Sequence, residues 1–225
     1  MKKRDILVSI IIPAHNEERY IKKTLLSVSK QSSKNIETIV VDDCSTDNTV
    51  KVAKKYADII IKLKKRGGVC HARNIGARKA KGSLLIFLDA DTILFGKNLI
   101  EEIIIQINKG FQHGTCKMMP EKAMNPDHVI YSEIKNFFIK NTKFKASNGI
   151  LFIKKDIHKK IGGFDEKKDK EEIFEYLIKA DKQGKFKFIE SGVIPSMRRG
   201  CAKTALYWMG IKSGLLRNKP YPVVR

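Results

Sequence analysis

The sequence predicts an α/β protein, a single domain in which helices flank a mostly parallel sheet, and two observations carry this prediction. Continuous apolar runs of strand length alternate with segments that repeat apolar residues at helical spacing through the first half of the chain. Strands that are apolar throughout belong to sheets covered on both faces, as parallel sheets are. The 225 residues, 42% of them hydrophobic, are enough for one sizeable core and few for two.

In the first half the two element types follow one another without interruption. We expect strands at 6–12, 36–41, 59–63 and 83–88, and helices at 17–30, 46–56 and 70–80. The first of these helices carries Ile21, Leu25 and Val28 on one face, which is the period of an amphipathic helix. Ligands of such sheets bind beyond the carboxyl ends of the strands, so polar residues at those ends are the candidate site residues.

The second half is less regular. Its expected helices are 97–109, 128–140, 169–183 and 202–217, and its expected strands are 149–154 and 186–190. The stretch 110–124 is a weak candidate for a sub-domain boundary. We therefore expect a domain over 1–190, with halves at 1–110 and 111–190, followed by a basic, amphipathic segment over 191–225.

Composition narrows the functional classes. The net charge of +21 favours anionic partners such as nucleic acid, anionic membrane or phosphate-bearing small molecules, although the dispersed lysines fit a solvated surface equally well. Four scattered cysteines form no C-x-x-C pair, which argues against a zinc site and fits a reducing compartment. Without a membrane-spanning apolar run or a signal-peptide cleavage site, we expect a cytoplasmic protein.

Two carboxylates, Asp89 and Asp91, follow the apolar run 84–88. Paired oxygen ligands at the rim of a sheet suit Mg²⁺ or Mn²⁺, which bind through one or two carboxylates and substrate phosphates. Taken alone, this pattern fits aspartates that close a strand and cap the next helix even better. The residues at the neighbouring strand ends therefore determine whether a metal site or a helix cap is the better interpretation.

Those neighbouring ends are also polar. The first expected strand leads into Pro13, His15 and Glu17, and the second into the adjacent acids Asp42 and Asp43. Such side chains can hydrogen-bond a base and ribose hydroxyls, while residues 45–47 can cap the next helix. Two adjacent acids at the end of a buried strand repel one another and need a partner.

A third polar segment, 66–76, begins with adjacent glycines before an expected helix that carries Arg73. The glycines permit close backbone approach, and the helix N-terminus together with Arg73 favours anions, although an ordinary turn would look the same. The sequence lacks the dinucleotide-binding, P-loop, zinc-protease and nucleophile-elbow motifs, which removes those common functional classes.

Four segments, VSIIIPAHNEERYI, IVVDDCSTDNT, GGVCHARNIGARKAKG and LLIFLDAD, resemble in order and spacing the donor-binding half of family 2 inverting glycosyltransferases. That family has the GT-A fold, a Rossmann-like fold of the nucleotide-diphospho-sugar transferase superfamily. The segment 161–166, IGGFDE, with Ser147-Asn148-Gly149 before it, resembles the stretch that precedes the family's catalytic base. The resemblance covers most of residues 6–190.

The resemblance implies a role for each strand-end residue. Those implied to bind the base and ribose of the donor are Pro13, His15, Glu17 and Asp43, with Asp43 on the base itself. Arg73 would lie close to the nucleotide. Asp89 would contact ribose or metal, and Asp91 would be the principal ligand of Mn²⁺ or Mg²⁺ through the diphosphate.

The catalytic base is where this sequence departs from the family, which usually has a Glu-Asp pair opening a helix. Counting back from Gly184 matches Glu172 to the glutamate and leaves Ile173 in place of the aspartate, whereas a shift by one residue gives Glu171 and Glu172 as the pair. A glutamate can act as general base if it reaches the acceptor hydroxyl. Acids are also favoured in a helix's first turn by the dipole alone, so an inactive protein is an open alternative.

Two features lie beyond the expected last strand. Arg198 and Arg199 can clamp a diphosphate or an acceptor phosphate, as in comparable segments of some family members, or form a solvated basic turn. The helix 202–217 has an apolar face flanked by cations, which fits packing on the core and, less often, an anionic membrane surface.

We expect a metal-dependent, inverting transferase that moves a sugar from a UDP- or GDP-sugar to a saccharide or lipid-phosphate acceptor, in the cytoplasm with peripheral association at the anionic inner membrane face. The alternatives are a catalytically impaired nucleotide-sugar binder, a nucleotidyltransferase and a basic nucleic-acid-binding protein. A nucleotidyltransferase would carry a glycine- and arginine-rich loop where 13–17 stands. No nucleic-acid-binding module is recognisable, so nucleic acid is not an expected partner.

Overall fold

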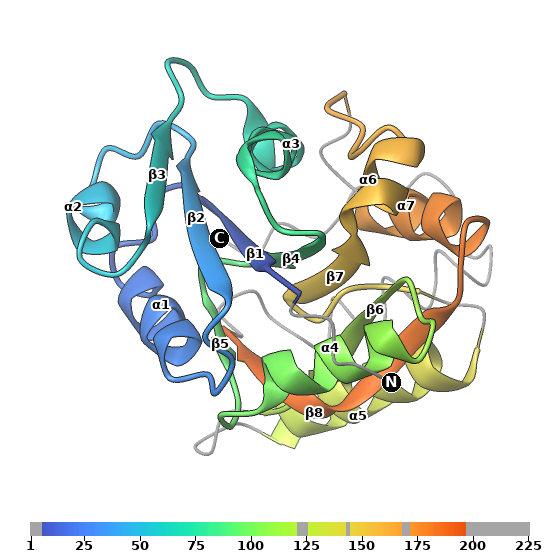
Figure 1. Cartoon of the computed structure of the whole chain (residues 1–225). Coiled ribbons are helices and arrows are strands. Elements are labelled where there is room, and N and C mark those ends of the chain that lie inside the picture. Colours follow the sequence, from blue (N-terminus) through green and yellow to red (C-terminus); the bar gives the residue numbers. More distant parts are fainter. Residues whose placement is uncertain (1–5, 121–125, 143–144, 168–171, 197–225) are drawn as a thin grey trace.

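The computed structural model describes residues 6–120, 126–142, 145–167 and 172–196, which form a curled sheet flanked by helices (Figure 1). The expected α/β fold with helices on both faces is confirmed. The sheet has eight strands in the order β3-β2-β1-β4-β7-β6-β8-β5. The strands are β1 (Val8–Ala14), β2 (Ile36–Asp42), β3 (Ile59–Lys62), β4 (Leu84–Leu88), β5 (Thr92–Leu94), β6 (His113–Met118), β7 (Ile150–Lys154) and β8 (Phe186–Pro195). The helices are α1 (Ile21–Ser29), α2 (Thr49–Ala53), α3 (Gly68–Lys79), α4 (Leu99–Asn108), α5 (Pro126–Asn141), α6 (Lys155–Lys160) and α7 (Glu172–Asp181).

Strands β3, β2, β1 and β4 run parallel and build the first half of the sheet. Successive side chains of a strand point to opposite faces, so these apolar runs feed two separate cores. Ile10 and Ile12 pack on one face with α1 and α4, and Ile11 packs on the other with α3 and α7. Burial on both faces explains why the strands are apolar throughout. Their carboxyl ends meet at one edge of the sheet.

The second half of the sheet is mixed. Strand β7 lies antiparallel between β4 and β6, β6 pairs in parallel with β8, and β5 closes the far edge against β8. Four of the seven strand pairings are therefore parallel, so the sheet is mostly parallel by a small margin. Because β7 pairs directly with β4, the two sequence halves share one continuous sheet.

Several elements differ from the expectation. The stretch 110–124 contains β6, which continues the same sheet and was missed because His113, Gly114 and Lys117 interrupt its apolar pattern. Strand β5 and helix α6 are too short to show a period. Strand β8 continues to Pro195, beyond the expected end at residue 190.

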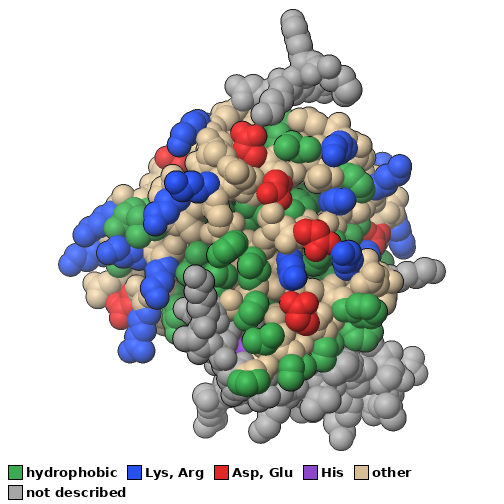
Figure 2. Space-filling model, turned by 90° about the horizontal axis from the view of Figure 1, so that it is seen from below, with side chains coloured by type: hydrophobic (Ala, Val, Ile, Leu, Met, Phe, Trp, Pro, Cys, Tyr) green, Lys and Arg blue, Asp and Glu red, His purple; other side chains and the backbone are tan. Residues whose placement is uncertain are grey.

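The expected C-terminal helix 202–217 lies outside the described residues. Within the part of the chain that the structure describes, no helix is both long enough and apolar enough to cross a membrane. On the face of the molecule seen from below, hydrophobic, basic and acidic side chains are intermixed (Figure 2).

Candidate active site

The turn after β4 places Asp89 and Asp91 at the rim of the sheet, and backbone contacts hold it there. The Asp89 amide donates to the Gly149 carbonyl (2.9 Å), and the Ser196 amide donates to the Asp91 carbonyl (2.9 Å). Strand β5 follows this turn directly, and the next helix, α4, begins only at Leu99. The two aspartates therefore do not cap a helix, which removes the alternative explanation of the pattern.

Gly149 explains how the Ser147-Asn148-Gly149 segment comes up against this turn. Its φ is +84°, and a Cβ at this position would lie 2.3 Å from Thr92 Oγ1. Only glycine fits both the backbone conformation and the close approach. The buried Asn148 beside it donates from Nδ2 to the Cys116 carbonyl (2.8 Å). A segment from the second half of the chain thus lies against the paired aspartates.

Arg73 joins the third polar segment to the fourth. Its side chain is 6% exposed, and one of its terminal nitrogens donates to Asp89 Oδ1 at 3.0 Å. The guanidinium carbon also lies 5.3 Å from the centroid of the Phe164 ring. The Asp89 side chain keeps 39% exposure, so its carboxylate is fixed by Arg73 and still reaches solvent.

Asp43 finds the partner that two adjacent acids need at the start of α3. Its Oδ1 accepts from the Gly67 amide (2.7 Å) and its Oδ2 from the Gly68 amide (2.9 Å). Gly68 has a φ of +83°, which glycine tolerates without strain. Each carboxylate oxygen has a second lone pair and can accept another hydrogen bond. His15, half-buried after β1, contacts the Asp43 carbonyl through Nδ1 at 2.7 Å.

The segment after β1 forms a turn that docks on the loop after β2. The Asn16 amide donates to Ser45 Oγ (2.9 Å), and the Glu17 amide donates to Thr49 Oγ1 (2.7 Å). Helix α1 consequently begins at Ile21 and not at residue 17. The N-cap residue of α2, Asn48, makes no side-chain capping hydrogen bond, whereas Asp47 Oδ1, one residue earlier, accepts from the Thr49 amide (2.9 Å).

The sequence-derived candidates thus divide into three groups. Those brought to one edge of the sheet are Pro13, His15, Glu17, Asp43, Arg73, Asp89 and Asp91. Glu172 is the first residue of α7, which packs on the loop 161–166 through Tyr176, whose ring stacks on Phe164 with centroids 4.0 Å apart. Glu171, Arg198 and Arg199 lie outside the described residues.

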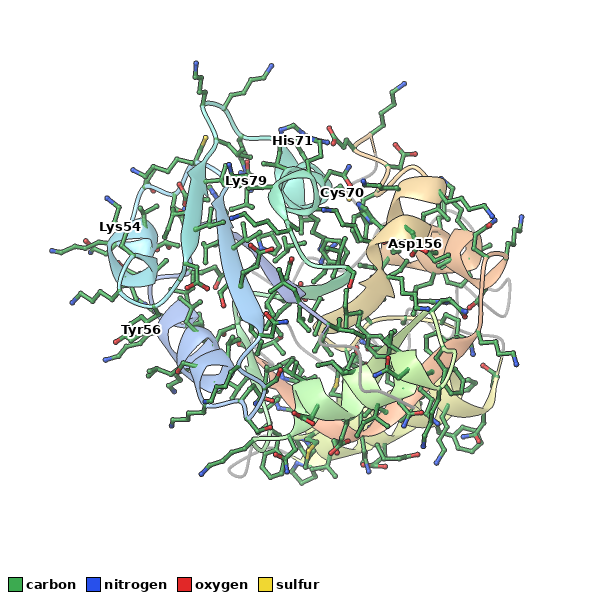
Figure 3. All side chains as sticks on the ribbon, in the orientation of Figure 1. Lys54, Tyr56, Cys70, His71, Lys79 and Asp156 are labelled. Carbon is green, nitrogen blue, oxygen red and sulfur yellow. The ribbon has the colours of Figure 1, made fainter. Side chains whose placement is uncertain are left out.

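Sequence reasoning missed two side chains of α3, His71 and Asn74, which contact the loop 161–166. Both stand inside the quoted motif GGVCHARNIGARKAKG, and Figure 3 labels His71 near the start of α3. The available signal was Asn74 itself, a polar residue within the quoted motif that turns out to be buried against the loop 161–166. Helical spacing alone assigns no role to such a residue.

The paired aspartates suit one class of metal ion. The described residues contain no group of three or more His, Cys, Asp or Glu side chains that could enclose a metal. Two carboxylates fit Mg²⁺ or Mn²⁺, which complete their coordination with water and phosphate oxygens, and do not fit a structural zinc site. Arg73 already orients one oxygen of Asp89, whose side chain still reaches solvent.

Comparison with known proteins gives a consistent result. The family model described as Glycosyl transferase family 2 matches residues 9–162. An uncharacterized glycosyltransferase of Haemophilus influenzae is 28% identical over 191 residues, which cover 77% of this chain and 61% of that protein. The Escherichia coli UDP-Glc:alpha-D-GlcNAc-diphosphoundecaprenol beta-1,3-glucosyltransferase WfgD is 33% identical over 140 residues, 58% of this chain and 55% of the relative.

Solved structures share the fold at low sequence identity. Residues 1–349 of Staphylococcus aureus TarS, in complex with UDP-GlcNAc, match with a TM-score of 0.69 at 20% identity, and the match covers 91% of this chain and 66% of that fragment. The mannosyltransferase PcManGT of Pyrobaculum calidifontis, in complex with GDP-Man and Mn²⁺, has a TM-score of 0.70 at 19% identity over 96% of this chain and 66% of that one. This chain is therefore shorter than each of these proteins.

Proposed function

The chain belongs to glycosyl transferase family 2, and from this we propose that it transfers a sugar from a nucleoside diphosphate to an acceptor hydroxyl with inversion at the anomeric carbon. The observation that carries the proposal is the meeting of Asp43, Arg73, Asp89 and Asp91 at one edge of the sheet. In an open α/β sheet this edge is where ligands bind.

The donor would be a UDP- or GDP-sugar bound across the ends of β1, β2 and β4. Asp43 would accept from the base through the lone pairs that Gly67 and Gly68 leave free, and Pro13, His15 and Glu17 would border the base and ribose. The complexes of TarS with UDP-GlcNAc and of PcManGT with GDP-Man support this class of donor.

Asp91, with Asp89, would hold Mn²⁺ or Mg²⁺ at the diphosphate. When bound, such an ion neutralises charge that develops on the departing nucleoside diphosphate. Arg73 would contribute separately, because its buried guanidinium holds Asp89 in one orientation and adds a positive charge close to where the phosphates would lie. The Mn²⁺ in the PcManGT complex supports the choice of ion.

The acceptor hydroxyl would attack the anomeric carbon from the side opposite the diphosphate. The new bond forms between the hydroxyl oxygen and that carbon while the bond from the carbon to the diphosphate oxygen breaks, so the configuration inverts. A carboxylate at the start of α7, Glu172 or its neighbour Glu171, would take the hydroxyl proton. Arg198 and Arg199 would contact the diphosphate or an acceptor phosphate.

For the acceptor we propose a saccharide or a lipid-phosphate carrier, reached in the cytoplasm at the inner face of the membrane. WfgD carries a diphosphoundecaprenol-linked acceptor in its name, and a net charge of +21 attracts anionic lipid surfaces. A nucleotide-sugar binder without transferase activity is the second candidate, because Ile173 stands where the family usually has an aspartate.

The first experiment separates donor and metal binding from catalysis. We expect UDP-glucose, UDP-N-acetylglucosamine or GDP-mannose to raise the melting temperature of the native protein, and Mn²⁺ to increase that shift, since ligands that bind only the folded state stabilise it. Asp91→Asn should abolish the Mn²⁺-dependent part. Asp156→Asn, an exposed acid on α6 (Figure 3), is the matched control and should respond like the native protein. An equal Mn²⁺ response in Asp91→Asn would overturn the metal role.

A further inference from the structure

Helix α3 holds the loop 161–166 through a paired contact between Asn74 and the backbone of Phe164. Asn74 is 7% exposed; its Nδ2 donates to the Phe164 carbonyl (2.9 Å) and its Oδ1 accepts from the Phe164 amide (2.9 Å). A primary amide supplies a donor and an acceptor side by side, which a carboxylate or a hydroxyl does not. Asn74 therefore satisfies both polar backbone groups of one buried residue.

The same helix face also holds the carboxylate of Glu166. Asn74 Nδ2 donates to Glu166 Oε1 (2.8 Å), and His71 Nδ1 lies 2.7 Å from Glu166 Oε2. His71 and Asn74 are three residues apart, so they lie on one face of α3. Hydrogen bonds from Asn74 and then His71 lower the pKa of Glu166, which keeps it in the charged form that accepts both.

Two glycines allow the loop to come this close. Gly162 and Gly163 have φ values of +79° and +73°, and a Cβ at Gly163 would lie 2.7 Å from Asn74 Oδ1. Glycine loses more conformational freedom on folding than any other residue, so such a loop needs contacts that fix it. The contacts with Asn74 and His71 supply that restraint.

The restrained loop connects the two sides of the candidate active site. Phe164 stacks on Tyr176 of α7, with centroids 4.0 Å apart and the rings 9° from parallel. The guanidinium of Arg73, which binds Asp89, also lies against the Phe164 ring. Arg73 and Asn74 are adjacent in sequence, so one turn of α3 holds both Asp89 and the residue against which α7 packs. Four residues, 168–171, separate Lys167 from Glu172 at the start of α7.

We propose that Asn74, assisted by His71, is a positioning residue of the transfer reaction. By holding Phe164 and Glu166 it sets the position of the loop and of α7 relative to Asp89. It thereby sets the distance between the donor and the glutamate at the start of α7 that is proposed to take the acceptor proton. Asn74 touches no reacting atom itself. The catalytic consequence rests on the proposed function. The contacts of Asn74 and His71 with Phe164 and Glu166, called the clasp below, are a property of the fold.

The clasp is tested without any substrate. In Asn74→Ala the Phe164 amide loses its acceptor, so hydrogen exchange in the peptide covering 161–167 should accelerate at least about tenfold, as expected for a segment that opens locally. Lys79→Ala, an exposed position at the end of the same helix (Figure 3), should exchange like the native protein. Native-like exchange in Asn74→Ala would overturn the clasp.

The catalytic consequence is tested with the nucleotide-sugar that most stabilises the native protein among UDP-glucose, UDP-N-acetylglucosamine and GDP-mannose. The measured quantities are its Kd and the kcat for release of UDP or GDP with water as acceptor. We expect Asn74→Ala to lower kcat at least about tenfold and to change Kd less than about threefold. Equal losses in kcat and affinity, or an unchanged kcat, would overturn the positioning role.

Two variants that exchange the amide and the carboxylate test whether a loss of kcat comes from the lost contact or from general misfolding. Asn74→Asp places a second carboxylate beside Glu166 and should lower kcat more than Asn74→Ala does. Adding Glu166→Gln restores a donor facing that carboxylate, so the double variant should regain kcat relative to Asn74→Asp, and no regain would contradict the clasp. If the native protein binds none of the three nucleotide-sugars, the proposed function fails and the positioning role with it, while the exchange result still decides whether the clasp exists.

Discussion

Arg73 links one of the paired aspartates to the loop 161–166 through two different contacts. It is buried, it pairs with Asp89, and it lies over the face of the Phe164 ring. Lysine would keep the charge but lose the planar contact with the ring and the forked geometry of the hydrogen bonds. A guanidinium at this position is therefore more specific than a positive charge alone.

Replacing Arg73 by Gln should lower the free energy of unfolding by about 1–3 kcal/mol, because buried hydrogen-bonding groups then lose a charged partner. The expected loss of stability is no larger because Asp89 is partly exposed, so water can solvate its carboxylate once Arg73 is gone. Urea unfolding measures the effect. Lys79→Gln on the exposed side of α3 is the control and should stay within about 0.5 kcal/mol of the native protein. A similar loss in both variants would contradict a specific role for Arg73.

At the residue scale the sequence indicates which side chains are candidates for binding and catalysis, but it does not indicate which residues they contact. Asp89 and Asp91 were identified as a pair, and the need of Asp43 for a partner followed from its neighbour Asp42. The partner itself, two amides at the start of α3, depends on how β2 and α3 lie in space and was not predictable. Asn74 was missed for the same reason, since its partners are 90 and 92 residues away in the chain.

At the scale of elements, α6 and α7 meet through a buried histidine. His158 lies in α6, and its Nδ1 is 2.7 Å from the hydroxyl of Tyr176 in α7. Burial, with smaller contributions from the positive charges of Arg78 and Lys155, lowers the pKa of His158 to about 4. The folded protein therefore holds His158 neutral at pH values where an unfolded chain, with a pKa of about 6.5, binds a proton.

This difference gives stability a defined pH dependence. Between about pH 6.5 and pH 4 only the unfolded state takes up the proton, so the free energy of unfolding should fall with decreasing pH by up to about 1.4 kcal/mol per unit. His158→Gln keeps a hydrogen-bond partner for Tyr176 and removes the titration. Urea unfolding at pH 7.5 and pH 5.0 should show a smaller loss for this variant than for the native protein. Equal losses would mean that His158 is not held neutral in the fold.

At the scale of the whole molecule, the strands of the first half and their parallel arrangement were predictable. In the second half β7 and β8 were expected as strands, whereas β5, β6 and the antiparallel pairings were not. Strands β1, β2 and β4 carry their apolar signal locally, and short helical connections dictate parallel neighbours. Strand β7 pairs antiparallel with β4 across more than sixty intervening residues, and β5 and β8 pair across nearly a hundred. These pairings join strands that are far apart in the sequence, so no local pattern within one strand reveals its partner.

The net charge of +21 acts on the molecule as a whole. Lys54 and Lys55, directly after α2, and Lys64, after the edge strand β3, are exposed, and Figure 3 labels Lys54 beside α2. Like charges on one surface repel in the compact state and are screened by salt. The chain should therefore be less stable at low ionic strength than its core alone would make it.

Raising NaCl from 20 mM to 300 mM should increase the melting temperature by a few degrees. At the higher salt the screening length falls below about 8–10 Å, which weakens the repulsion between the lysines. Changing Lys54, Lys55 and Lys64 to Gln should raise the melting temperature at 20 mM NaCl and reduce its dependence on salt. Changing the same three lysines to Arg keeps the charge and is the matched control, which should behave like the native protein. If the Gln and Arg variants respond to salt alike, the excess charge at this edge does not destabilise the fold, and the lysines there would have to be explained by local contacts.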